Sequence, residues 1–171
     1  AQGFYPALYY PHNIHFLWSS ATMQGQRQLS IDSARRVVAN VRVEQVKQFP
    51  TIEFFRTVPL LSLVRFGEWE AVLAEPAPDV SFKFATAIWH YARGVAQAAL
   101  GEPAAANVEL AALLPLQSDV SVVFLDSMDY PGSLLIGIAI DLLRGVMAYR
   151  TGDYASAVTE FETAVDVLDT L

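Results

Sequence analysis

The sequence predicts an all-α protein made of about four antiparallel helical hairpins. Apolar residues recur at steps of three and four along most of the chain, which is the period of an amphipathic helix. Prolines stand where helices can start, at Pro11 and Pro103, because the first turn needs no donor from them. Glycines close the apolar segments, and another segment follows each of them: Gly25, Gly67, Gly101 and Gly152.

The first predicted hairpin covers about residues 11–48. Its first helix starts at Pro11 and ends before the turn at Gly25. Either Ser30 or Asp32 is expected to cap the second helix, since short side-chain oxygens satisfy the free amides of a first turn. The predicted second helix then continues unbroken to about residue 48.

The second predicted hairpin covers about residues 51–75. A helix over 51–66 contains Pro59, which is expected to remove one backbone hydrogen bond and kink the axis. A short helix over 68–74 follows. The proline-rich string at 75–79 then breaks the chain before the next hairpin.

The third predicted hairpin covers about residues 81–114 and turns at Gly101. The fourth covers about residues 133–170 and turns at Gly152. Between them, residues 115–132 are expected to form a long connection. Because structureless loops of that length are uncommon, this connection is expected to be ordered against the helices.

Composition narrows the function classes. The chain has 171 residues, 53% of them hydrophobic, which is enough for the core of one domain over residues 1–171. With 11 Lys+Arg against 18 Asp+Glu, the net charge of −7 disfavours nucleic acid as a partner. The best apolar run, 134–140, is too short to cross a membrane, so no membrane partner is expected.

The compartment stays open between cytoplasm and periplasm. The absence of cysteine excludes disulfides and thiolate chemistry without selecting either compartment. The chain begins Ala-Gln-Gly with no signal-peptide pattern, so we expect that processing or truncation removed the natural start.

The segment 143–158 resembles a tetratricopeptide repeat, a family in which small residues stand where two helices cross. Gly145, Ala157 and Ala164 are the small residues here, and Phe161 is the large one that interlocks the pair. The same frame recurs in the preceding hairpin at Arg93-Gly94, Gly101, Ala106 and Leu110. Gly67 and Gly101 also lie 34 residues apart, equal to the repeat period of this family.

The string Tyr9–Trp18 is similar to one in larger bacterial tetratricopeptide proteins, in which helices continue on both sides. This second resemblance implies that the chain is a fragment or a short relative. Together the two resemblances imply a tetratricopeptide-like α-solenoid over residues 1–171. They imply a protein or peptide interaction scaffold, with no cofactor and no enzymatic activity.

In that frame, the first helix of each pair lines a concave face that binds the partner. The side chains expected on this face are mixed aromatic, cationic and imidazole groups, a composition typical of binding surfaces. They are His12, His15, Ser19, Phe54, Thr57, Arg65, Tyr91, Tyr149 and Arg150. Arg65 and Arg150 would favour an acidic segment or a C-terminal carboxylate. Burial of several of these residues in the core is the alternative.

A rival interpretation is a ligand- or metal-binding domain of a larger protein or enzyme. His12 and His15 stand three residues apart on one helix, so both imidazoles could reach one metal ion. A third ligand would have to come from His90 or from the acidic segment 119–129. His90 is more simply interpreted as a hydrogen-bonded, half-buried histidine beside an apolar helix face.

The remaining sequence patterns are interpreted without a catalytic or metal-binding role. Asp119, Asp126 and Asp129 fit no EF-hand spacing and read as a solvated acidic turn. Arg93 and Arg144 are expected to pair with acids of adjacent helices, with a ligand carboxylate as the alternative. Motifs for nucleophilic, phosphate or dinucleotide chemistry are absent, so no enzyme is predicted. Apolar residues reach the last position of the chain, which favours either self-association through the terminal helices or further helices downstream.

Overall fold

The computed structural model describes residues 9–171, and these residues form helices without any strand. The all-α prediction is therefore confirmed. The chain divides into two compact units, unit 1 at residues 1–68 and unit 2 at residues 69–171. The prediction of a single repeat domain over the whole chain stays a prediction.

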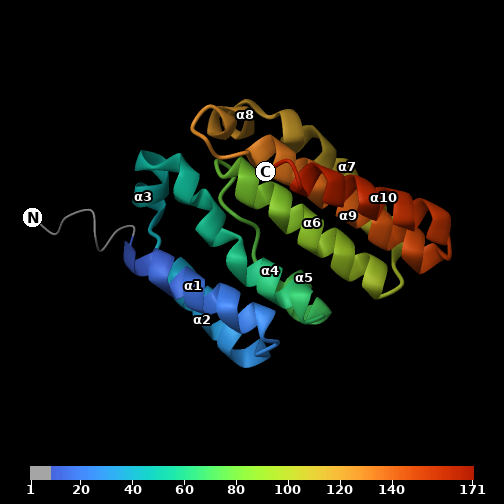
Figure 1. Cartoon of the computed structure of the whole chain (residues 1–171), viewed down its shortest axis with the longest axis horizontal. Coiled ribbons are helices and arrows are strands. Elements are labelled where there is room, and N and C mark those ends of the chain that lie inside the picture. The colour runs from blue at the N-terminus through green and yellow to red at the C-terminus, as the bar shows by residue number, and fades with distance from the viewer. Residues whose placement is uncertain (1–8) are drawn as a thin grey trace, which may run out of the picture. The chain divides into compact units, whose positions relative to one another are not determined.

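Unit 1 is built around two helices that pack on each other, with a third packed on the second. Its core is aliphatic and aromatic, with Val37 and Ala34 fully buried and Phe55 nearly so. The elements are α1 (Tyr10–Met23), α2 (Arg27–Ala39), α3 (Val43–Gln48), the 3-10 helix η2 (Pro50–Arg56) and α4 (Val58–Arg65), as Figure 1 shows.

The second helix of the first predicted hairpin starts earlier than expected and breaks in two, so the cap prediction is wrong. Ser30 lies inside α2 with its side chain buried, and Asp32 lies further along the same helix. The break follows at Asn40, whose side-chain amide donates back to the carbonyl of Arg36 (2.8 Å). α2 begins at Arg27, directly after the turn at Gly25, so position 30 lies within the helix and not at its cap.

Ser30 instead belongs to a chain of hydroxyls inside unit 1. Trp18 Nε1 donates to Ser62 Oγ (2.5 Å), and Ser62 Oγ lies 3.1 Å from Ser30 Oγ. Ser30 Oγ in turn lies 2.6 Å from Thr22 Oγ1. Because buried hydroxyls are costly without partners, this chain ties α1, α2 and α4 together.

The predicted helix over 51–66 is also divided, and its expected kink at Pro59 is wrong. The break lies at Thr57, where η2 ends and α4 begins. Pro59 falls in the first turn of α4, where no backbone bond is lost. A proline inside a continuous helix costs about 3 kcal/mol, and starting a new helix just before it avoids that cost.

Unit 2 consists of packed antiparallel helices. α6 packs on α5, α7 and α9, and α9 packs on α10 (Figure 1). Leu113, Ile136 and Leu143 are completely buried among them. The elements are α5 (Trp69–Ala74), α6 (Lys83–Ala99), α7 (Pro103–Leu113), the 3-10 helix η3 (Leu114–Ser118), α8 (Val120–Asp126), α9 (Gly132–Thr151) and α10 (Tyr154–Leu168).

The segment 115–132 is largely helical, which corrects the prediction of a long connection. η3 and α8 occupy most of it, and Asp119 caps α8 by accepting a hydrogen bond from the Ser121 amide (2.8 Å). Val122 and Leu125 are buried, so the segment is ordered against its neighbours as expected. The apolar string at 120–125 was too short for periodicity to separate helix from loop.

All the turn glycines adopt the left-handed conformation, with φ between 69° and 84°. In each turn the glycine amide donates to the carbonyl three residues back, and the following amide donates to the carbonyl five residues back. At Gly152, for example, these acceptors are Tyr149 and Ala148. This bonding is the Schellman motif, which ends a helix and reverses the chain. The turns at Gly25, Gly67, Gly101 and Gly152 were thus correctly predicted.

In the last hairpin, α9 and α10 cross closely at Gly145. A Cβ atom built on Gly145 would lie 2.5 Å from the Phe161 ring, so only glycine leaves room for the ring at this crossing. Ala157 and Ala164 are buried on the same side of α10. Gly94 plays the same part between α6 and α9, since a Cβ there would lie 2.6 Å from Leu143.

α9 is long and apolar enough to cross a membrane by length and composition alone, with 20 residues and a mean hydropathy of 1.5. The apolar run at 134–140, which was predicted to be too short to cross a membrane, lies inside this longer helix. A core helix of a soluble protein meets the same criterion, and α9 buries Ile136, Ile140 and Leu143 inside unit 2. Contacts with α6, α8 and α10 account for the buried part of α9, which is 33% of its apolar window.

Candidate functional site

Unit 2 contains a pocket of about 510 Å³ where α6 ends, α7 begins and α9 ends. That volume lies in the range of small-ligand sites. Small side chains leave the space open, because the neighbouring helix ends carry alanine and glycine. The lining residues are Ala98, Ala99, Gly101, Pro103, Asn107, Met147, Ala148, Arg150 and Thr151.

Arg150 is the charged residue of this pocket, and sequence reasoning had placed it on the binding face. It is exposed in the last turn of α9, and its guanidinium has no ion-pair partner within residues 9–171. Thr151 turns its hydroxyl inward onto the carbonyls of Met147 and Ala148 (3.1 and 3.0 Å). The pocket therefore offers an apolar floor with one cation free to bind an anion.

Tyr149 and Tyr91 are the other predicted site residues of unit 2, and neither lines this pocket. Tyr149 is exposed and lies against Tyr154, with ring centroids 5.6 Å apart. Tyr91 lies on α6, where burial raises the pKa of its phenol to about 12. Tyr149 is thus available to a partner, while Tyr91 belongs mainly to the packed interior.

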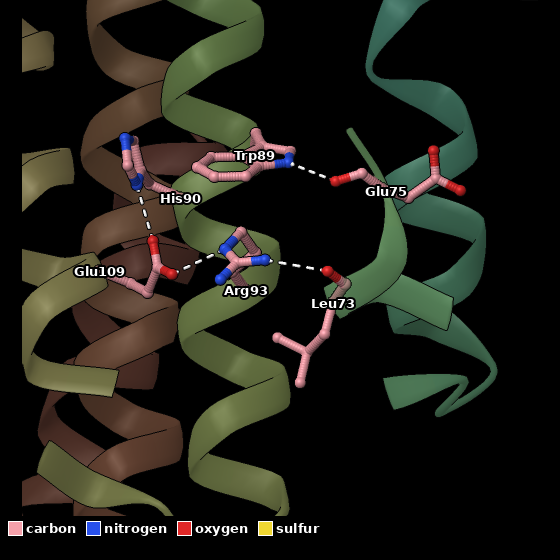
Figure 2. A network of polar contacts seen from close by, with 6 residues as sticks. All are labelled: Leu73, Glu75, Trp89, His90, Arg93 and Glu109. Carbon is pink, nitrogen blue, oxygen red and sulfur yellow. Dashed lines mark hydrogen bonds and ion pairs between the residues drawn. The ribbon is translucent and has the colours of Figure 1, made fainter. Parts of the chain in front are cut away.

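A polar network crosses α6, as Figure 2 shows. Glu109 receives a hydrogen bond from Arg93 Nε (2.7 Å), and its other oxygen lies 2.7 Å from His90 Nδ1. Arg93 also donates to the Leu73 carbonyl (3.0 Å), and Trp89 Nε1 donates to the Glu75 carbonyl (3.1 Å). The predicted hydrogen-bonded His90 and the predicted pairing of Arg93 are both confirmed.

The same network sets the charge of Glu109. Burial alone would raise the pKa of this carboxyl, but the hydrogen bonds and charges of His90 and Arg93 outweigh it and lower the pKa. Arg93 also lies over the Trp89 ring, 4.5 Å from its centroid, a cation–π contact. Through its bonds to the Leu73 carbonyl and to Glu109, Arg93 holds α5, α6 and α7 together.

Arg144 makes a weaker pair within its own helix, 3.7 Å from Asp141. Burial raises the pKa of the Asp141 carboxyl, and the Arg144 charge opposes that rise. The prediction that Arg144 pairs with an acid of an adjacent helix is therefore wrong. The partner is on α9 itself, not on an adjacent helix.

In unit 1 the structure gathers two of the predicted residues into an aromatic cluster. The His15 ring lies 4.8 Å from Trp18 and 5.4 Å from both Phe54 and Phe55. Burial among these rings, and secondly the charge of His12, lowers the pKa of His15. A neutral, half-buried imidazole in this position acts mainly as a packing element.

The remaining predicted residues of unit 1 have different surroundings. His12 is exposed and lies edge-on to Phe16, 4.5 Å between centroids. Ser19 is half-buried, and Arg65 is exposed in the last turn of α4. Thr57 is buried, and its hydroxyl donates to the Phe54 carbonyl (2.7 Å), which does not fit a place on a binding face.

Within residues 9–171, no group of three His, Asp or Glu side chains is placed to hold a metal ion. His12 and His15 therefore lack the third ligand that the metal interpretation needs. Asp119 caps α8, and Asp126 accepts from the Ser133 amide (3.0 Å), so both carboxylates serve local turns.

No protein-family model matches the chain, and no curated protein or solved structure matches it significantly.

Sequence reasoning missed most of the pocket, although it named Arg150. The repeat frame was used to select large and charged side chains for the binding face. The space of the pocket is instead left by small side chains such as Ala98, Ala99 and Ala148. A usable signal was available in the sequence. Alanines cluster in the last turn of one helix, and a turn glycine and a proline follow them, Gly101 and Pro103.

Proposed function

We propose that the chain is a tetratricopeptide-like interaction module that binds a carboxylate-bearing peptide segment of a partner protein. The observation that carries the proposal is the pocket of about 510 Å³ whose only cation in the lining, Arg150, has no acid partner within residues 9–171. In a chain with a net charge of −7, an arginine without an acid neighbour is available for a ligand anion.

The helical packing of unit 2 supports the tetratricopeptide likeness. Its hairpins turn through left-handed glycines, and Gly145 lies directly against Phe161. The proposal concerns unit 2 by itself, because the pocket lies wholly within that unit. Either an acidic side chain or a free C-terminus would supply the carboxylate, since both form the same forked pair with a guanidinium.

The test is an array of peptides in matched pairs that end in a carboxylate or a carboxamide, probed with the full chain. Peptides with acidic residues in the middle form a second set. We expect hits that need a carboxylate, with affinity falling at least tenfold in Arg150→Gln, because about 1.5–3 kcal/mol is typical of a charge-assisted hydrogen bond.

Arg144→Gln is the matched control, because Arg144 lies on the same helix but is paired with Asp141 and lies outside the pocket. It should leave peptide binding unchanged. Equal losses in the two variants, or an array without carboxylate-dependent hits, would refute the proposal.

A further inference from the structure

The exposed face of α10 carries an apolar stripe that no described element covers. Tyr154, Val158, Val165 and Leu168 retain 63%, 54%, 53% and 54% of their surface exposed. Half-buried Phe161 continues the series at helical spacing, and its ring packs against Gly145 of α9. On the neighbouring side of the helix, Ala157 and Ala164 pack toward α9. The stripe thus runs beside the face that holds α10 in unit 2, and Phe161 belongs to both.

Acidic residues line one edge of this stripe. Glu162 follows Val158 by one helical turn, and Asp169 follows Val165 by one turn. Asp166 lies one turn beyond Glu162, and all three carboxylates are on exposed residues. From Tyr154 to the end of the chain there is no lysine or arginine. The surface therefore combines contiguous apolar side chains with a negative edge that no base on α10 neutralises.

From this combination we infer that the α10 face docks a basic amphipathic helix of a partner protein. The stripe from Tyr154 to Leu168 is about 21 Å long at 1.5 Å per residue, so it accommodates roughly four turns of a partner helix. Apolar side chains of that helix would pack along the stripe, and lysine or arginine beside them would meet the acidic edge.

Charge also decides against two other occupants. A second copy of the chain would bring another acidic edge to this face and no base from α10, and like charges brought together oppose association. An anionic lipid surface would be repelled by Glu162, Asp166 and Asp169. A basic helix satisfies both the apolar and the electrostatic features.

The test measures binding of designed peptides of about 18 residues to the full chain by fluorescence anisotropy. The first peptide has leucines at heptad spacing flanked by lysines. The second replaces its lysines with glutamates, and the third keeps the composition of the first but disperses the leucines. We expect the first to bind at least tenfold more tightly than the others, and to weaken as salt is added.

Substitutions locate the binding on α10. The double variant Val158→Ser with Val165→Ser should bind the basic peptide at least tenfold more weakly. The double variant Val120→Ser with Val123→Ser, on α8, should bind it as the wild type does. All four valines are exposed, so circular dichroism should show an unchanged fold.

Because the whole chain is acidic, a control must separate the effect of the acids on α10 from the effect of net charge. Glu162→Lys with Asp166→Lys should shift preference from the basic to the acidic peptide. Glu44→Lys with Glu70→Lys changes the net charge equally at exposed positions on α3 and α5, and it should preserve the preference.

Four results would overturn the inference. The basic and acidic peptides could bind equally, or the α8 variant could weaken binding as much as the α10 variant. Light scattering could reveal a dimer that Val158→Ser with Val165→Ser dissociates, which would assign the face to a second copy. Sedimentation with vesicles of phosphatidylserine that requires Val158 and Val165 would assign it to a membrane.

Discussion

At the scale of single residues, Glu109 is a buried acid whose surroundings set its charge. Only 8% of the surface of Glu109 is exposed, yet its carboxylate remains ionised because His90 and Arg93 each contact one of its two oxygens. Burying a lone carboxylate would be strongly unfavourable, and the two partners offset that cost. The arrangement links α6 to α7 through charge, at a place where the alanine-rich helix α7 offers few large apolar contacts.

Replacing this carboxylate should show its contribution directly. We expect Glu109→Gln to lower the free energy of unfolding by about 1.5–3 kcal/mol near neutral pH, since hydrogen bonds to a charged group are lost. The measurement is urea unfolding followed by circular dichroism. Glu162→Gln, an exposed acid on α10, is the control and should change little.

The effect should depend on pH in a defined direction. The folded state lowers the pKa of Glu109 below its usual 4.5, so it favours the ionised form. The stabilisation is therefore complete above the usual pKa and is lost as the pH falls through the lower, folded-state pKa. The difference between wild type and Glu109→Gln should shrink as the pH is lowered below the usual pKa, and a difference that stays constant would contradict this account.

At the scale of elements, α9 contains two glycines with different neighbours. A Cβ on Gly145 would collide with the Phe161 ring, which the packing of α10 holds in place. A Cβ on Gly137 would meet only the end of the Gln117 side chain, at 2.7 Å. Gln117 is exposed, and its terminal amide makes only a long hydrogen bond to the Ser133 carbonyl (3.4 Å), so it is free to move aside.

The same substitution should therefore have opposite effects at the two positions. We expect Gly145→Ala to destabilise unit 2 by about 1–3 kcal/mol through overpacking. Gly137→Ala should be neutral or stabilise by about 0.5–1 kcal/mol, since alanine is the better helix former. Thermal unfolding of the two variants side by side makes the comparison. Equal effects would mean that the crossing of α9 and α10 is not as close as described.

At the scale of the whole molecule, the chain consists of two compact units with separate cores. Ala92, Leu113, Ile136 and Leu143 are buried within unit 2, and its polar network closes on residues of the same unit. A unit with its own core is expected to fold without the rest of the chain. Unit 1 has its own chain of hydroxyls, which runs from Trp18 to Thr22 through Ser62 and Ser30.

Unit 2 should therefore fold as a separate polypeptide. We expect residues 69–171 to give a helical circular dichroism spectrum and one cooperative unfolding transition. A shorter fragment, residues 83–171, lacks α5 and the carbonyls of Leu73 and Glu75 that accept from Arg93 and Trp89. It should unfold at lower temperature. A longer fragment without cooperative unfolding would show that unit 2 depends on unit 1.

The sequence by itself determined the helical class, the turns and the last two hairpins. Those features depend on local physics: a glycine at Gly101 or Gly152 adopts a left-handed conformation cheaply, and apolar periodicity marks a helix face over many residues. Short segments were predicted poorly. In α3, η2 and α8, few residues carry the period, and tertiary contacts decide between helix, 3-10 helix and loop.

Tertiary structure alone decided which polar residues face inward and where space remains. Ser30 could not be separated from a capping serine by sequence, because its partners Thr22 and Ser62 come from two other helices. The pocket beside Arg150 depends on three helix ends meeting in space. The alanines before Gly101 and Pro103 indicate a place where space could remain, but packing between distant segments decides whether it does.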